Sequence, residues 1–308
     1  MHFEHTLSGP FRLERSEDIF GGWMAASEEP GAIAMAFPVE GWRASAAVIL
    51  RQPRPEALAG DVHGAGADAA RAWAQALAVL SADCDGAGWP AVGQRDPLMG
   101  ELQVRYHYLR PVLFHSPYEA AAALIIGHRI SIRQGRTIRA AMAERHGDAI
   151  AVNGATLHAF PRPQALVDLA EFPSLSTEKI ERLHGIAAAA LEGLLDRATL
   201  RALPLDEALA RLRTLRGVGD FFAQGILLRG AGVVDAVTDE DVTKEALQLA
   251  YHLPERPTQQ RVLEVAERWR PYRMWGTVLL HVWLRREQGG PHHPPRPARR
   301  PPRPSATK

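Results

Sequence analysis

A glycine-rich turn and a nearby acidic cluster are the residues of this chain best suited to chemistry. Two glycines flank a β-branched valine in the segment Leu215-Arg216-Gly217-Val218-Gly219. Apolar residues recur at helical spacing on both sides of this segment. Because glycine has no Cβ, such a turn lets backbone N–H groups approach a phosphate closely. Downstream, Thr238-Asp239-Glu240-Asp241 opens another helical pattern, and a carboxylate there would stabilise positive charge that grows on a sugar. Together, the turn and the acidic cluster predict a protein that binds DNA and breaks a bond to a base.

Both features also have an ordinary structural interpretation. A Gly-x-Gly turn alone is typical of two helices joined through a glycine C-cap. Thr238 and Asp241 have the spacing of a capping box, and acids are common in the first turn of a helix. We expect Asp239 and Glu240 to face solvent. Lys244, one turn after Asp241, is expected to be an ion-pair partner and not a nucleophile.

The composition is that of a globular protein without a strong net charge. Of the 308 residues, 46% are hydrophobic and 23% are charged, and the formal net charge is +1. A DNA-binding surface must therefore be a local patch. The single cysteine, Cys84, excludes an internal disulfide and a four-cysteine zinc or iron–sulfur site, which fits a reducing cytoplasm. We expect no membrane span and no secretory signal, because no apolar run reaches about 18 residues and residues 1–5 lack a signal pattern.

The patterns predict an α+β fold that is mostly α-helical. Residues 1–98 are expected to form a small domain with an antiparallel sheet and a helix. Ile33, Met35 and Phe37 alternate with alanines as in a half-buried strand, and residues 46–50 supply a second strand.

The remaining chain divides into a helical domain and a tail. Residues 99–286 are expected to be helical, and the glycine- and proline-containing stretch 86–97 is interpreted as a linker. Residues 287–308 are rich in proline and arginine, which is typical of a disordered tail.

Capping residues mark the first helices of the helical domain. In Ser116-Pro117-Tyr118-Glu119, serine is expected to cap and Glu119 to return a bond to the cap amide. Ser131 and Gln134 form a second capping pattern, and Gly147 is expected to end that helix in a left-handed conformation. Further helices are predicted around residues 73–80, 163–170, 177–195, 206–213, 221–229, 242–251 and 275–286.

Several segments together resemble the helix-hairpin-helix (HhH-GPD) DNA glycosylases, in particular the branch of 3-methyladenine DNA glycosylase II. The resemblance covers about residues 100–286 and implies a sheet domain and an all-helical domain that form a cleft. Besides the turn at 215–223, it rests on residues 117–131, Phe160-Pro161-Arg162-Pro163, Leu228-Arg229-Gly230 with Asp235 and Asp241, and Trp269-Arg270-Pro271-Tyr272-Arg273.

The resemblance assigns roles to the turn and to one carboxylate. Gly217 and Gly219 would hold a DNA phosphate, with a monovalent cation bound at their carbonyls, while Val218 and Ala223 pack the two helices. Asp241 matches the invariant aspartate of the family, which stabilises an oxocarbenium-like transition state and positions the attacking water.

A second set of implied roles concerns the type of reaction and the surrounding charge. Phe221 stands where bifunctional relatives carry a lysine, which implies hydrolysis without lyase activity, with no cofactor and no catalytic metal. Arg216 beside the turn, with Arg133, Arg136 and Arg213, would form the basic patch. A solvated helix face is the alternative for these arginines.

A base must leave the duplex before such chemistry, and protein side chains must fill the gap. The family places its wedge after Gly127, where this chain departs from the pattern: His128 replaces a glutamine and Arg129 an apolar residue. Aromatic faces attract cationic alkylated bases by about 0.5–2 kcal/mol. Candidates to line the base pocket, with core packing as the alternative, are Phe221, Tyr106, Tyr108, Trp275 and Trp283.

The sequence thus predicts a monofunctional glycosylase that removes damaged, alkylated bases from double-stranded DNA. It is expected to be a cytoplasmic monomer, associated with the bacterial nucleoid when bound. One alternative is a helix-hairpin-helix DNA-binding protein without catalysis. Another is a helical interaction protein with a coincidental hairpin.

Overall fold

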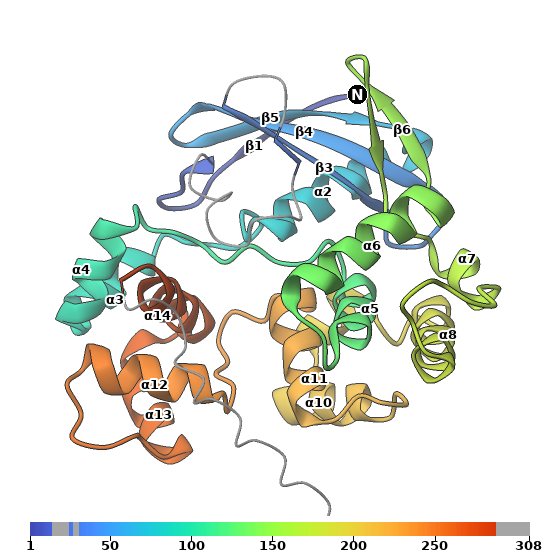
Figure 1. The fold of residues 1–308 in the computed structure, drawn as a ribbon. Helices are drawn as coiled ribbons and strands as arrows, with labels where there is room; N and C mark the ends of the chain where they lie inside the picture. The colour runs from blue at the N-terminus through green and yellow to red at the C-terminus, as the bar shows by residue number, and fades with distance from the viewer. Residues whose placement is uncertain (14–24, 27–30, 288–308) are drawn as a thin grey trace, which may run out of the picture.

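A sheet lies above two groups of helices in the computed structural model, which describes residues 1–13, 25–26 and 31–287 (Figure 1). The first group consists of α3 (Trp89–Arg95), α4 (Pro97–Arg105), α12 (Asp241–Ala250), α13 (Gln259–Ala266) and α14 (Arg273–Glu287). The second consists of α5 (Pro117–Gly127), α6 (Ile132–His146), α7 (Pro163–Val167), α8 (Thr177–Leu191), α9 (Arg197–Ala202), α10 (Leu205–Arg213), α11 (Asp220–Gly225) and its π-helical continuation η3 (Ile226–Ala231). The predicted α+β, mostly helical fold is confirmed. Residues 288–308 of the predicted tail lie outside the described residues.

The sheet has five antiparallel strands in the order β1-β5-β4-β3-β2. On β3, Ile33, Met35 and Phe37 point to one face, as their alternation predicts, and join the main hydrophobic core. That core continues through the predicted helix α2 (Ala69–Val79) into the first helix group. The strands are β1 (His2–Thr6), β2 (Ala25–Ala26), β3 (Ala32–Pro38), β4 (Ser45–Arg54) and β5 (Ala57–His63).

The other face of the sheet is also covered, which the sequence did not predict. A hairpin of β6 (Ala149–Val152) and β7 (Ala155–His158) interrupts the helical domain. Ile150 and Val152 pack on the alanines of β3 and β4 in a small separate core. β3 is therefore buried on both faces, and the expectation of a half-buried strand is wrong.

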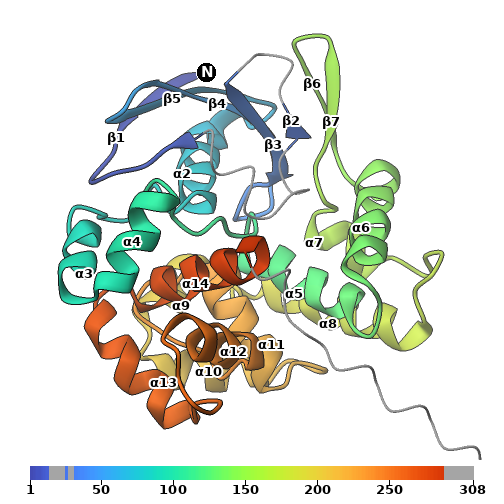
Figure 2. The same cartoon turned by 60° about the vertical axis from the view of Figure 1, so that its left-hand side comes forward.

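The stretch 86–97, interpreted as a linker, is instead structured. It contains α3, whose Trp89 is fully buried against Tyr272 and Trp275, with ring centroids 5.7 Å apart in both pairs. Its Gly93 permits close packing, since a Cβ there would lie 2.6 Å from the Cα of Gly100 on α4. These glycines bring two helices together, and Figure 2 shows α3 and α4 beside α13 and α14.

The capping patterns are confirmed at one helix and only in part at the other. At α6, Ser131 and Gln134 form the full capping box. At α5, the Ser116 hydroxyl accepts the bond from the Glu119 N–H at 3.1 Å, but the Glu119 carboxylate bonds to His115 and not to the cap amide.

Gly147, after α6, is extended and not left-handed as expected, with φ −90° and ψ 173°. A Cβ at this position would lie 1.8 Å from the Ala159 carbonyl oxygen, so close packing requires the glycine. The other predicted helices are present within a few residues of their expected bounds, whereas α3, α4, α9 and α13 were not predicted.

The turn after β3 joins the sheet to the second helix group. Trp42, with φ +62°, inserts its side chain among buried residues of α5 and α8. Its indole N–H donates to the Ala190 carbonyl at 3.0 Å, and its ring meets Tyr118 edge-on at 5.1 Å. The sheet is therefore held directly against α5 and α8, which belong to the same helix group as the glycine turn.

Candidate functional site

The glycine turn joins α10 to α11 in a helix-hairpin-helix arrangement. Gly217 has φ +84°, a left-handed conformation that glycine adopts without strain. Val218 is 6% exposed and packs into the core of the second helix group, and Ala223 is fully buried between the helices. The apolar side chains of the turn thus fix its shape from inside, while both glycines lie on the surface.

The outer side of the turn is open. Gly219 has φ −88°, and a Cβ added to it would meet no atom of the described residues within 4 Å. No described side chain caps α11, so its first N–H groups stay free to bind an external anion. This geometry is compatible with a bound phosphate.

The charges beside the turn are largely paired. Arg216 lies 3.1 Å from Glu181, and Arg213 lies 2.9 Å from Asp220. Both pairs are exposed, so each is weak and a phosphate can compete for the arginine.

Three of the four arginines of the predicted basic patch are exposed, and Arg136 is half-buried. Arg133 is exposed at the start of α6, whereas Arg136 is half-buried and lines a cavity on the sheet side of that helix. Arg133, Arg213 and Arg216 therefore remain as exposed candidates for contacts to DNA.

Two side chains of α8 support the turn and the neighbouring end of α5, and sequence reasoning missed both. A Cβ at Gly217 would lie 2.7 Å from the Arg182 side chain, so Arg182 packs directly on the turn. Lys179 donates to the carbonyls of Ile126 and His128 at 2.7 and 2.9 Å and thereby caps α5. Nothing in the local sequence links these residues to segments about 35 and 50 positions away.

The turn after Gly127 presents the predicted wedge residues to different extents. Arg129 is exposed with φ +61°, and His128 is half-buried. The His128 ring meets Phe222 edge-on at 5.6 Å, and partial burial together with the Arg129 charge lowers the pKa of His128. A further apolar side chain here is Ile132, which is 77% exposed.

Asp241 begins α12 on an exposed surface. Its side chain is 87% exposed, and one carboxylate oxygen lies 3.5 Å from the Arg256 guanidinium. The capping box with Thr238 is absent, because the Thr238 hydroxyl donates to Glu240 at 2.6 Å and Glu240 occupies the cap position. Asp241 is thus available to a ligand that approaches from outside.

The other charged residues of this segment differ in their surroundings. Lys244 forms the expected ion pair, with Asp239 as its partner. Glu240 is half-buried, which contradicts the expectation that it faces solvent. Burial lowers the pKa of Arg229 on η3 to about 10, and the Glu240 charge opposes that change. The start of α12 therefore lies close to the helix that continues from the glycine turn.

A buried histidine packs behind the start of α12. His281 of α14 lies 2.9 Å from the Thr243 hydroxyl through Nε2. Burial lowers the pKa of His281 to about 3, and the charges of Arg229 and Arg285 lower it further. This imidazole is neutral near pH 7.

Comparison with known proteins supports the same arrangement, although no family model matches the chain. The DNA-3-methyladenine glycosylase of Bacillus subtilis (strain 168) is 24% identical over 195 residues, which are 61% of this chain and 64% of that relative. The probable bifunctional transcriptional activator/DNA repair enzyme AlkA of Mycobacterium tuberculosis is 28% identical over 181 residues, 58% of this chain and 35% of that protein. The matches therefore span less than two thirds of the length of these relatives.

Solved structures match over almost the whole chain. The 3-methyladenine DNA glycosylase of Archaeoglobus fulgidus has a TM-score of 0.75 and 20% identity, covering 92% of this chain and 98% of that one. The chain therefore has the fold of this DNA glycosylase. The 8-oxoguanine glycosylase/lyase of Clostridium acetobutylicum in complex with DNA, another solved structure, has a TM-score of 0.67 and 17% identity and covers 92% and 97% of the two chains.

The aromatic candidates for the base pocket lie in different environments. Phe221 is 62% exposed beside the glycine turn. Trp275 is fully buried, 4.9 Å from Tyr272 and below the Arg110 guanidinium, so it is a core residue and its assignment to a base pocket is wrong. Tyr106 is buried as well and donates to Glu287.

The two remaining aromatic candidates, Tyr108 and Trp283, are half-buried at the border of the main core. Their assignment to a base pocket stays a prediction. In residues 1–13, 25–26 and 31–287, no helix has the length and apolar character needed to cross a bilayer.

Proposed function

We propose that this protein is a monofunctional DNA glycosylase that hydrolyses the N-glycosidic bond of damaged, alkylated bases in duplex DNA. The observation that carries the proposal is the open glycine turn together with an exposed carboxylate, Asp241, directly after Glu240, whose charge acts on Arg229 of η3. Its sequence relatives of the 3-methyladenine branch support the choice of substrate.

In the proposed reaction the turn binds the backbone and Asp241 acts on the sugar. A phosphate accepts bonds from the N–H groups around Gly217 and Gly219 and positions the protein without reading sequence. As the bond between the base and C1′ breaks, the bonding electrons leave with the base, and an alkylated cationic base departs neutral. The Asp241 carboxylate stabilises the positive charge on the sugar. Water adds to C1′ and its proton passes through Asp241 to solvent.

Two residues support hydrolysis without a covalent intermediate. Phe221 stands two positions after Gly219, where an amine would be needed to attack the sugar. Lys244, the amine nearest to Asp241 in sequence, is 19% exposed and paired with Asp239. We further propose a cytoplasmic monomer that associates with the nucleoid through its DNA contacts.

The test is base release from methylated duplex DNA, detected as alkali-labile abasic sites, by wild type, Asp241→Asn and the matched control Asp239→Asn. Wild type and the control should release base, and Asp241→Asn should bind DNA but release base at least 100-fold more slowly, because it lacks the charge that stabilises the transition state. Binding without release by wild type would support the non-catalytic DNA-binding alternative. Equal release by all three would refute the role of Asp241, and no DNA affinity at low salt would support a helical interaction protein.

A further inference from the structure

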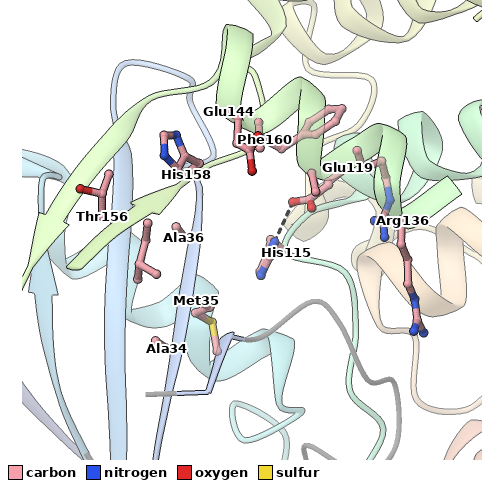
Figure 3. Close-up of a pocket in the computed structure, with 14 residues that line it drawn as sticks. Ala34, Met35, Ala36, His115, Glu119, Arg136, Glu144, Thr156, His158 and Phe160 are labelled. Atoms are coloured by element: carbon pink, nitrogen blue, oxygen red, sulfur yellow. Dashed lines mark hydrogen bonds and ion pairs between the residues drawn. The ribbon is translucent and has the colours of Figure 1, made fainter. Parts of the chain in front are cut away.

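A cavity of about 340 Å³ lies between strand β3, the end of the β6–β7 hairpin and helix α6. Its volume falls within the usual range of small-molecule sites, about 300–1,000 Å³. Figure 3 shows the residues that line it. None of them belongs to the glycine turn or to the acidic segment before α12, so the cavity is separate from the proposed catalytic surface. Ala34, Met35, Ala36, Ala140 and Ala143 form much of its apolar wall.

The polar centre of this cavity is a rigid histidine. The side chains of His115 and Glu119 are 5% and 8% exposed, and His115 Nδ1 lies 2.7 Å from the Glu119 carboxylate. The His115 ring stacks on Phe37 at 5.2 Å, and its carbonyl accepts bonds from Gln75 and Arg197. Backbone and ring are therefore both held in place.

The second ring nitrogen of His115 is unused. Nε2 is buried and has no hydrogen-bond partner among the described residues. In a neutral imidazole whose Nδ1–H donates to the Glu119 carboxylate, Nε2 carries the lone pair and accepts a hydrogen bond. In Figure 3 the imidazole projects into the cavity from the side that holds Glu119. Buried acceptors are normally hydrogen-bonded, so a ligand in the cavity could supply the donor.

The remaining walls restrict the ligand to a neutral, flat molecule. Arg136 and Arg139 offset Glu119 and Glu144, so the lining carries no net formal charge. Both β3 and α6 contribute apolar side chains to the lining, which suits a planar ring. No cluster of three or more His, Cys, Asp or Glu side chains able to hold a metal ion occurs in the described part of the chain.

Heterocycles with an N–H donor, as in nucleobases, match a histidine acceptor beside apolar side chains.

We propose that the cavity binds a free purine base, with an N–H of the base donating to His115 Nε2. This inference rests on the proposed function, because such a base is the leaving group of that reaction. The site would retain the released base away from the DNA-binding surface.

Titration of the full chain with 3-methyladenine and with adenine, followed by calorimetry and ligand-observed NMR, tests the proposal. Wild type should bind at least one of the two bases. His115→Phe keeps the ring and its stacking but removes the acceptor, and it should weaken binding at least tenfold. Ala140→Phe, at an exposed position of the cavity wall, should abolish binding by filling the space. The matched control His2→Phe, on the exposed strand β1, should bind like wild type.

Asp241→Asn separates this proposal from the proposed function. It should bind the free base like wild type, whether or not wild type releases bases from DNA. Loss of binding in Asp241→Asn would overturn the proposal by placing the base at the catalytic carboxylate. No binding by wild type, or unchanged binding in Ala140→Phe, would also overturn it. If His115→Phe fails to fold, Ala140→Phe decides alone.

Discussion

Replacement of Gly219 by alanine separates DNA binding from the stability of the turn. Gly219 has φ −88°, which alanine adopts freely, and the added Cβ would meet no described atom within 4 Å. The free energy of unfolding should therefore stay constant or rise by about 0.4–1 kcal/mol. On the outer side, however, the methyl group occupies the space in which we propose a phosphate. Loss of one hydrogen bond to a charged oxygen costs about 1.5–3 kcal/mol, or roughly a 10- to 150-fold increase in Kd.

Fluorescence anisotropy with a labelled methylated duplex at one fixed salt concentration measures this effect, because such affinities depend strongly on salt. Urea unfolding of the same samples reports stability. Gly185→Ala is the matched control, since Gly185 is an exposed glycine of α8 with equally open surroundings in the described structure. A folded Gly219→Ala protein that binds DNA as tightly as wild type would refute the phosphate contact at the turn.

Three further predictions address the aromatic residues and the buried histidine. Phe221→Ala should change the free energy of unfolding by less than about 1 kcal/mol, because the side chain is 62% exposed, yet lower base release at least tenfold; unchanged release in a single-turnover assay would remove Phe221 from the site. Trp275→Ala should destabilise the protein by about 3–5 kcal/mol in urea unfolding, because it empties a fully buried position; a stable variant that loses only activity would restore Trp275 to the base pocket. The pKa of His281, about 3, lies below that of a free histidine, about 6.5, so unfolding takes up a proton. Its contribution to stability is complete above pH 6.5 and falls by at most about 1.4 kcal/mol per pH unit toward pH 3. Urea unfolding at pH 7 and pH 5 should show a smaller loss for His281→Gln than for wild type, and equal losses would contradict the assigned burial.

Helix caps and turns could be predicted from the sequence where residues close together in the chain determine them. Ser131 caps α6 with Gln134, and the glycine turn joins two helices, because both depend on groups a few positions apart. The predictions were wrong where a contact with a residue from another element replaced the expected local one. Glu119 bonds to buried His115 and not to the cap amide, and Gly93 serves close helix packing and not a linker.

The candidate site follows the same division. The turn and the acidic segment are contiguous, so their residue types could be recognised directly. Glu240 accepts a bond from Thr238 and interacts electrostatically with Arg229, and Trp275 packs against Trp89 and Tyr272. Such packing depends on segments up to about 190 residues apart and has no local signature.

The insertion of Trp42 among α5 and α8 limits how the protein can move. Hinge opening between sheet and helices would extract an indole that is 7% exposed and break its bond to the Ala190 carbonyl. Trp42 therefore opposes rotation of the sheet away from α5 and α8. If duplex DNA binds as we propose, distortion falls on the DNA, where bending a site of 20–30 base pairs costs roughly 1–6 kcal/mol. Lesions next to flexible pyrimidine–purine steps should consequently be excised faster than the same lesions within stiff A-tracts.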